Sequence, residues 1–133
     1  MRYLLDTNAI SHVIDFPRGS VAQRIRTEAV TGTLVTSVIV VAELRYGYTK
    51  ISSRRLRDAY ETFFESLPIE NWEAPFDHVY ADIRDQLTKK GRSIGAMDML
   101  IAAHALATDA VVVTANIKHF SEVPGLKVEN WLR

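Results

Sequence analysis

Short apolar runs alternate with longer amphipathic segments along the whole chain. Short continuous apolar runs are typical of buried strands, whereas apolar residues that recur every three or four positions predict helices with one buried face. The pattern predicts strands at 3–5, 33–36, 68–73, 110–114 and 128–131. It predicts helices at 8–15, 21–29, 38–47, 52–67, 76–90 and 96–108.

Capping and turn residues support these boundaries. Ser37 is a good N-cap for the helix that follows it, and that helix is predicted to stop near Gly47. The alternation of strands and helices indicates an α/β fold, in which helices cover both faces of a mainly parallel sheet. No linker, repeat or low-complexity tract interrupts the pattern, so we expect residues 1–133 to form a single domain.

The composition narrows the function classes. The chain has no cysteine, which excludes disulfides, thiolate nucleophiles and zinc–thiolate sites. Its 16 basic and 16 acidic residues balance, whereas domains that bind nucleic acid by charge alone are usually basic. A nuclease with a local basic rim remains compatible with this balance. The apolar run at the N-terminus is too short for a signal peptide or a membrane span, so we expect a cytoplasmic protein with no membrane partner.

Three carboxylates interrupt runs that are otherwise apolar. Asp6 directly follows the first predicted strand, Glu43 lies within the apolar segment 38–44, and Asp98 lies within the apolar segment 94–103. Neither of the last two segments contains Lys or Arg. A buried ionised carboxylate is strongly disfavoured unless something compensates its charge. The pattern therefore suggests that the three acids share a cation.

The predicted topology can bring these acids together. Functional groups gather beyond the carboxyl ends of parallel strands, and Asp6, Thr114 and Asn116 all stand at such ends. Magnesium and manganese prefer oxygen ligands and keep several waters, so a few carboxylates suffice to hold them. Such an ion lowers the pKa of a bound water and stabilises charge on a phosphoryl oxygen. The sequence therefore predicts metal-assisted phosphodiester hydrolysis.

Four motifs occur in the order in which PIN-domain proteins carry them. They are DTN at 6–8, AELRYG at 42–47, IGAMDMLIAAHA at 94–105 and VTAN at 113–116. The chain resembles most strongly the VapC-type toxins of bacterial toxin–antitoxin pairs, including the FitB-like members, and the resemblance extends to VPGL at 123–126. It implies a PIN-like three-layer α/β/α fold. It also implies a Mg²⁺- or Mn²⁺-dependent endoribonuclease that a small antitoxin inhibits.

The resemblance also implies roles for individual residues. Asp6, Glu43 and Asp98 correspond to the catalytic, metal-binding acids of the family. Asn116, a further catalytic candidate, stands where many PIN domains have Asp, and His119 stands where relatives often have an acid. Because Asn can position a ligand but adds no negative charge, these two departures favour one metal ion at rest, or a second ion that arrives with RNA.

Structural roles are the alternatives for every candidate. Asp6 could cap a helix, Glu43 could lie on a solvated face, and Asp98 could occupy a position favoured by the helix dipole. Residues beside the acids either hold turns or orient the carboxylates; they are Thr7, Asn8 and Thr114. Basic residues shortly before Asp98 are candidates for contacts to RNA phosphates; they are Lys89, Lys90 and Arg92. His104 is expected to be structural.

The resemblance implies two kinds of partner. One is an RNA substrate, and the other is a cognate antitoxin, a small DNA-binding protein with a disordered tail. We expect a homodimer and a higher toxin–antitoxin oligomer, with the tail lying along a groove between the early helices and the 52–67 helix. Two other functions remain open. One is a catalytically inactive PIN-like binding or regulatory protein, and the other is a metal-dependent DNA nuclease, since no residue can be assigned to a 2′-hydroxyl contact.

Overall fold

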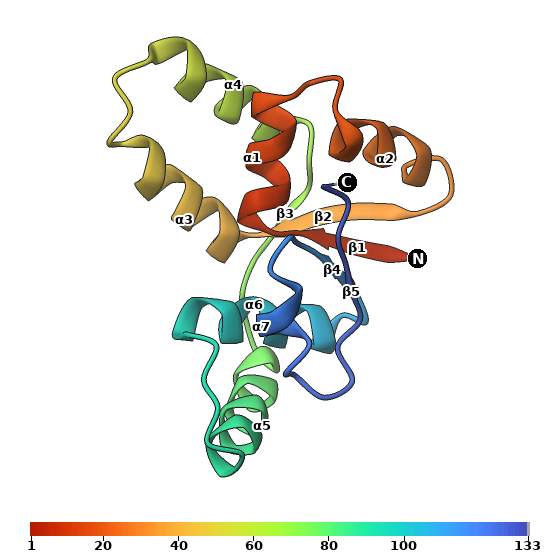
Figure 1. Cartoon of the computed structure of the whole chain (residues 1–133), viewed down its shortest axis with the longest axis vertical. Coiled ribbons are helices and arrows are strands. Elements are labelled where there is room, and N and C mark those ends of the chain that lie inside the picture. The colour runs from red at the N-terminus through yellow and green to blue at the C-terminus, as the bar shows by residue number, and fades with distance from the viewer. Residues whose placement is uncertain (133) are drawn as a thin grey trace.

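A parallel sheet forms the centre of the molecule (Figure 1). The computed structural model describes residues 1–132, and in that range five strands pair in the order β3-β2-β1-β4-β5. β1 is the middle strand, and Leu4 lies between Val35 of β2 and Val112 of β4. The strands are β1 (Arg2–Leu5), β2 (Thr33–Ser37), β3 (Ile69–Glu70), β4 (Val111–Val113) and β5 (Val128–Glu129).

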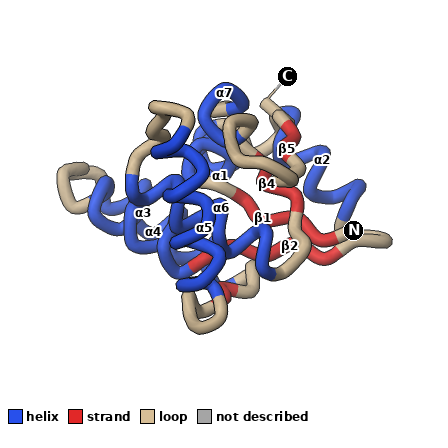
Figure 2. Tube along the Cα trace, turned by 90° about the horizontal axis from the view of Figure 1, so that it is seen from below, coloured by secondary structure: helices blue, strands red, loops and turns tan. Residues whose placement is uncertain are grey.

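Helices cover both faces of this sheet, as the alternating pattern predicted. α1 to α4 lie on one side, and α5 to α7 lie on the other (Figure 1). Seen from below, α3 to α6 gather at the side of the molecule away from the chain termini (Figure 2). The helices are α1 (Thr7–Asp15), α2 (Ser20–Glu28), α3 (Val38–Tyr48), α4 (Arg54–Glu65), α5 (Phe76–Lys89), α6 (Ala96–Ala107) and α7 (Ile117–Phe120).

Local sequence explains where the helices of one face begin. The Ser37 hydroxyl accepts a hydrogen bond from the Ile39 amide at 3.1 Å and caps α3, as predicted. The Ser53 hydroxyl accepts one from the Leu56 amide at 3.2 Å and caps α4. The first residue of α4 is therefore Arg54, two residues after the predicted start at Ser52. The aromatic stripe of α4 packs into the core, where Tyr60 is buried. Capping and burial thus fix the positions of α3 and α4.

Three details differ from the sequence prediction. The short helix α7 was not predicted, because four residues are too few to show a helical period. The two edge strands are shorter than expected, since β3 and β5 contain two residues each. Trp131, predicted to end the last strand, instead packs its ring against Tyr3 with centroids 5.0 Å apart. The four strand pairings of the described residues are all parallel, which confirms the predicted parallel sheet.

The core lies between the middle strands and the helices on each face. Leu4, Leu5 and Val112 are fully buried on the strands, and Ile10 of α1 and Ile101 of α6 are fully buried above and below them. Such burial on both faces explains why the strand sequences read as continuous apolar runs. Across residues 1–132, no helix has both the length and the apolar character that a membrane crossing requires.

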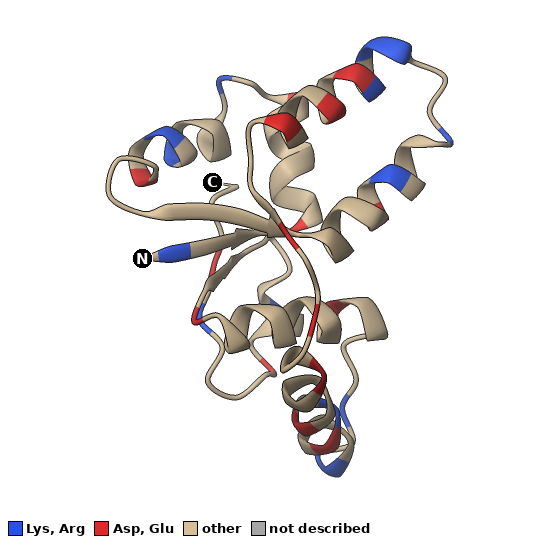
Figure 3. Cartoon of the chain, turned by 180° about the vertical axis from the view of Figure 1, so that it is seen from behind, with Lys and Arg blue, Asp and Glu red and all other residues tan. Residues whose placement is uncertain are grey.

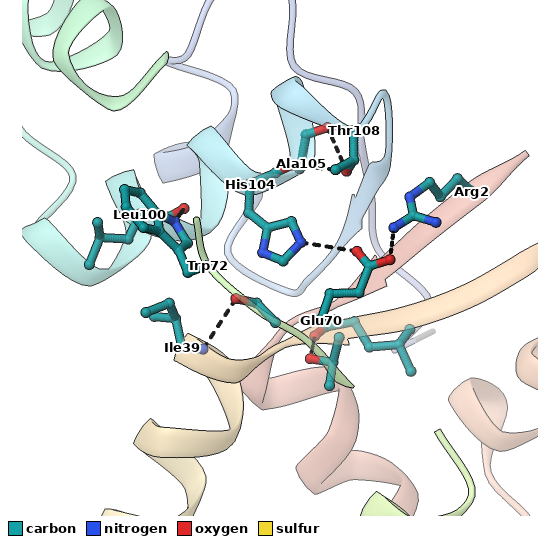
Figure 4. Close-up of polar contacts among 11 residues, drawn as sticks. Arg2, Ile39, Glu70, Trp72, Leu100, His104, Ala105 and Thr108 are labelled. Atoms are coloured by element: carbon teal, nitrogen blue, oxygen red, sulfur yellow. Dashed lines mark hydrogen bonds and ion pairs between the residues drawn. The ribbon is translucent and has the colours of Figure 1, made fainter. Parts of the chain in front are cut away.

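A polar cluster fastens the edge strand β3 to the rest of the sheet (Figure 4). Glu70 pairs with Arg2 of β1 and lies 3.0 Å from the Nε2 atom of His104, whose side chain is fully buried in α6. Close by, the Trp72 indole donates to the Leu100 carbonyl at 2.8 Å. His104 is therefore a structural residue, as expected, and we call Arg2, Glu70 and His104 the edge-strand cluster.

Candidate functional site

Three acids face one rim of the sheet. Asp6 follows β1, Glu43 lies in the middle of α3, and Asp98 lies in the first turn of α6. α1, α3 and α6 all begin on the side where the strands end (Figure 1). The ribbon positions of Lys and Arg, by contrast, include the outer ends of α3, α4 and α5 (Figure 3). Within residues 1–132, the three acids form no ion pair with Lys or Arg.

Asp6 is the most buried of these acids, with 3% of its surface exposed. The Thr114 hydroxyl donates to its Oδ2 atom at 2.8 Å, whereas its Oδ1 atom is buried and has no hydrogen-bond partner. Asp6 occupies the N-cap position of α1, but its side chain makes no capping hydrogen bond. Helix capping therefore does not explain why a carboxylate is placed here.

A network of short hydrogen bonds fixes the Thr114 hydroxyl. The Asn8 amide nitrogen donates to Thr114 Oγ1 at 3.1 Å, and the Asn8 oxygen accepts from the Ala115 backbone amide at 2.8 Å. The Asn116 backbone amide also donates to Thr114 Oγ1, at 3.0 Å. Since two donors reach the oxygen of Thr114, its proton is directed at Asp6. Asn8 and Thr114 thus hold the loop after β4 against the acid that follows β1.

Asp98 faces two side chains from the region of α7. Asn116 donates from Nδ2 to Asp98 Oδ2 at 3.4 Å, and His119 Nδ1 lies 3.3 Å from the same oxygen. Asn116 and His119 also contact each other at 3.0 Å. The side chain of Asp98 is 23% exposed and that of His119 is 51% exposed, so this end of the site is open to solvent. The Oδ2 atom of Asp98 is therefore held, while its Oδ1 atom makes no hydrogen bond within the described residues.

Burial and mutual repulsion act on the acids in the same direction. Burial raises the pKa of Asp6, although the Thr7 backbone amide and the Thr114 hydroxyl oppose this change, and the charge of Asp98 raises the pKa further. Partial burial raises the pKa of Glu43, and the charges of Asp6 and Asp98 add to the effect. The three carboxylates are therefore close enough to repel one another, and a shared cation would relieve that repulsion.

The donor set suits a hard divalent cation, although the acids are not drawn together around one point. In the described residues, no three acidic or histidine side chains stand close enough to hold one metal ion between them. The unpartnered, buried Oδ1 atom of Asp6 is nonetheless an oxygen ligand that lacks a donor or cation. Carboxylates and an Asn side chain are the oxygen ligands that magnesium-type ions prefer. The residues present therefore fit such an ion.

The predicted basic residues stand apart from the acids. Lys89 pairs with Asp85 at 2.9 Å within α5, and Arg92 pairs with Glu122 at 3.1 Å. Lys90, at the end of α5, has no acidic partner among residues 1–132. These three side chains lie on the exposed surface at the far end of α5, and two of them are already engaged by acids.

Two contacts at the site were not predicted from the sequence. The first is the pairing of His119 with Asp98, which required knowledge of the short helix α7. The second is the Ser11 hydroxyl of α1, which lies 2.9 Å from the Tyr60 hydroxyl of α4 beside the acids. The sequence did hold a signal for Ser11: it lies four residues after Thr7, and residues four apart share a helix face. Ser11 could therefore have been predicted to face the site.

Comparisons with known proteins identify the family to which the whole fold is similar. The family model described as PIN domain matches residues 3–126. The chain is 37% identical to Ribonuclease VapC2 of Rickettsia felis over 98% of each sequence. It is 30% identical to the tRNA(fMet)-specific endonuclease VapC of Salmonella typhimurium, again over 98% of each. It superposes on a chain of the crystal structure of VapBC2 from Rickettsia felis bound to a promoter DNA fragment, with a TM-score of 0.93, 36% identity, and coverage of 98% of this chain and 99% of the other.

Proposed function

The chain belongs to the PIN-domain family and, within it, to the VapC-type ribonucleases, and from this membership we propose that it is the toxin of a toxin–antitoxin pair. In this proposal one PIN domain, residues 1–133, hydrolyses RNA phosphodiester bonds in the cytoplasm. A cognate antitoxin inhibits it. Catalysis depends on a divalent metal ion, Mg²⁺ or Mn²⁺.

The state of Asp6 is the observation that supports this proposal most directly. Its carboxylate is almost fully buried, its Oδ1 atom has no partner, and the neighbouring charges come from Asp98 and Glu43. A purely structural acid would be paired or capped, because an uncompensated buried carboxylate is strongly unfavourable. An arrangement that leaves three acids uncompensated is expected where an ion completes the site.

Asp6, Glu43 and Asp98 would hold the metal ion. When bound, the ion neutralises the three carboxylates, acidifies a bound water and stabilises charge on the phosphoryl oxygens of the substrate. The acids would have to close in around it, since they are not arranged around one point in the described structure. Glu43, which is half-buried on α3, has the longest side chain of the three and the most freedom to adjust.

The surrounding residues position these acids. Thr114, held by Asn8, fixes Oδ2 of Asp6 and leaves Oδ1 directed elsewhere. The Thr7 backbone amide also acts to lower the pKa of Asp6. Asn116 holds one oxygen of Asp98 and, as a neutral donor and acceptor, is placed to orient a water or a phosphate oxygen beside it. Asp6 and Asp98 are thereby each restrained at one carboxylate oxygen and available at the other.

Contacts to the RNA backbone are assigned to Lys89, Lys90 and Arg92. Positioning contacts to phosphates usually come from Lys and Arg. Lys90 is the strongest of these candidates, because Lys89 and Arg92 already pair with Asp85 and Glu122. Both of those pairs are exposed, so a phosphate can compete for the cations.

The antitoxin is proposed to bind an apolar groove between α1 and α4. A cavity of about 420 Å³ lies there, and its lining includes Val13, Ile14, Pro17 and Phe63. Phe63 also lines a second cavity of about 300 Å³ towards α2. An apolar segment of a partner can occupy such a groove. This location agrees with the groove expected from the sequence, and a homodimer of toxins would carry two such grooves.

Two other functions are separated from this one by experiment. An inactive PIN-like regulatory protein would have no need for three uncompensated acids, and a DNA nuclease would cut DNA in preference to RNA. Purified protein should therefore be assayed with total cellular RNA and with single- and double-stranded DNA, in the presence of Mg²⁺, Mn²⁺ or excess EDTA. We expect cleavage of RNA only, and only with a divalent ion present.

The decisive comparison uses Asp98→Asn, which keeps the shape of the side chain but removes its charge. Expression of the wild type should arrest growth, and sequencing of RNA ends should show defined cleavage sites. Asp98→Asn should abolish both effects. Asp82→Asn, an exposed acid on α5, is the matched control and should behave as the wild type. Cleavage by Asp98→Asn in excess EDTA at the wild-type rate would refute the mechanism.

A further inference from the structure

A pocket of about 390 Å³ opens beside Glu43, one of the three acids, between α1, α3 and α4. Thr7 and Glu43 both contribute to its wall, so it is continuous with the acidic site. Its volume falls within the range of sites that hold small molecules and is ample for one nucleobase. A group in this pocket would lie next to the bond that the acids act on.

Neutral polar and aromatic groups dominate the wall. The Ser11 and Tyr60 hydroxyls lie 2.9 Å apart, and either atom can be the donor. The rings of Tyr48 and Tyr60 stand with centroids 5.8 Å apart, while Leu44 and Ile51 add apolar surface. Hydroxyl groups both donate and accept hydrogen bonds. The wall therefore suits a flat, uncharged group whose edge carries donors and acceptors.

The charge of the pocket argues against a phosphate. Among residues 1–132, none of those that line it is Lys or Arg, and Glu43 contributes a negative charge to the wall. Phosphate contacts usually come from cationic side chains and backbone amides. An antitoxin segment is disfavoured as well, since the apolar groove that suits it is lined by different residues of α1 and α4, including Val13 and Phe63.

We infer that this pocket, which we call the Tyr60 pocket, receives one unstacked base of the RNA substrate beside the scissile phosphodiester. The inference rests on the proposed ribonuclease function. Proteins that recognise RNA sequences usually bind single-stranded loops, where they stack unpaired bases on aromatic rings and contact the base edges through hydrogen bonds. Ser11 and Tyr60 are the residues that would select the base, through their hydroxyls.

The test uses RNA hairpins with a randomised loop, followed by sequencing of the cleaved ends. The wild type should show a base preference at one position next to the cut. Tyr60→Phe and Ser11→Ala each remove one hydroxyl and should reduce that preference about three- to tenfold, the effect of losing one hydrogen bond. Tyr80→Phe, whose hydroxyl accepts from the exposed Arg84 on α5, is the control. A merely structural role would lower the rate without changing the base distribution.

A second variant fills the pocket instead of altering its polarity. Gly47 lines the pocket on α3, and a Cβ atom placed there would have no neighbour within 4 Å. Gly47→Leu should therefore fold, and its side chain should exclude a base. We expect it to abolish the base preference at the same position that Tyr60→Phe affects. Preferences unchanged in Gly47→Leu, Tyr60→Phe and Ser11→Ala would overturn the inference while leaving the ribonuclease function intact.

Binding measurements separate this inference from the proposed function. The Asp98→Asn protein should bind the preferred hairpin more tightly than one with an abasic site at the same position, and Tyr60→Phe should reduce that difference. If the wild type cuts no RNA but this difference in affinity is observed, the ribonuclease function fails, whereas the binding of a base in the Tyr60 pocket stands. If the hydroxyl variants change only the affinity for the antitoxin, the pocket is an antitoxin contact and the inference is wrong.

Discussion

Glu70 of the edge-strand cluster and the three acids of the site have opposite electrostatic surroundings. Burial alone would raise the pKa of Glu70, but hydrogen bonds from Arg2 and His104 hold it below its ordinary value. Burial also lowers the pKa of His104, so the charged pair is Arg2 with Glu70, and neutral His104 donates from Nε2. Asp6 and Glu43 lie among other acids, and their pKa values are raised.

Exposure to solvent alone does not explain the difference between Glu70 and the acids of the site. The side chains of Glu70 and Asp98 are 29% and 23% exposed, so both are removed from water to a similar extent. Arg2 pairs with Glu70. Within the described residues no Lys or Arg pairs with Asp6, Glu43 or Asp98, although the His119 ring lies 3.3 Å from Asp98. An acid compensated by the chain stabilises the fold, whereas acids that are left uncompensated identify a place where an external cation binds.

The largest effect expected from this comparison is the loss of activity in Asp6→Asn. Removing the most buried carboxylate should lower the rate of RNA cleavage on the order of 100-fold or more, since changes around metal ligands alone typically cost 10–100-fold. Initial rates measured against Mg²⁺ concentration test this. Asp58→Asn, an exposed acid on α4, should leave the rate unchanged. If Asp6→Asn cleaved RNA at the wild-type rate, Asp6 would not be part of the catalytic site.

The corresponding change in the edge-strand cluster should affect stability instead. Glu70→Gln keeps a hydrogen-bond acceptor for His104 but leaves Arg2 without its ion-pair partner. We expect the free energy of unfolding to fall by about 1–3 kcal/mol, because a partly buried cation is left unpaired. Urea denaturation measures this loss, and RNA cleavage at low denaturant should be retained. An unchanged midpoint would show that the cluster contributes nothing to the fold.

The pH dependence of the metal-free protein should separate the two groups by sign. Because the folded-state pKa of Asp6 is raised, the folded chain binds protons more tightly, and this group favours folding more as the pH falls towards the carboxyl range. In EDTA, Asp6→Asn should therefore be more stable than the wild type near neutral pH, and the gap should close on acidification.

For Glu70 the folded-state pKa is lowered, so its contribution is complete above the unfolded pKa and is lost as the pH falls through the folded pKa. Glu70→Gln should be less stable than the wild type near neutral pH, and this gap should also close in acid. Thermal melts across a pH series in EDTA give both differences. If Asp6→Asn and Glu70→Gln differed from the wild type in stability in the same direction near neutral pH, the contrast between the two groups would be wrong.

The smallest effect is expected at an ion pair on the surface. Arg45 of α3 donates to both carboxylate oxygens of Glu61 on α4, at 3.1 and 2.9 Å, and the two side chains are 52% and 42% exposed. Arg45→Gln should lower the free energy of unfolding by only about 0.2–1 kcal/mol, because solvent screens such pairs. Urea denaturation in low and high salt tests this. A loss as large as that of Glu70→Gln would show that exposure does not govern these pairs.

Much of the fold could be predicted because local signals agree with the tertiary structure. The apolar run before Asp6, the cap at Ser37 and the apolar run 111–113 each specify their element without help from distant residues. The convergence of Asp6 and Asp98 on one rim follows from a general rule of parallel sheets. Helix α7 lacks enough residues for any period to be visible, and the strand predicted at 68–73 is only two residues long in the structure.

The contacts that the sequence did not reveal join residues that are distant along the chain. Glu70 meets Arg2 across 68 positions and His104 across 34, and no local pattern marks these pairs. The hydrogen bond from Thr114 to Asp6 spans 108 positions. Thr114 was predicted either to hold a turn or to orient an acid, and choosing between these roles required the geometry.

The middle position of β1 has a consequence for the synthesis of the chain. The strand that precedes Asp6 leaves the ribosome before either of its neighbours, and one of them, β4, is made more than a hundred residues later. Until then neither the Val113 carbonyl that binds the Asp6 amide nor the Thr114 hydroxyl that binds its carboxylate exists. The geometry around Asp6 is therefore assembled only after β4 has been made, and a fragment that ends before β4 carries no assembled site.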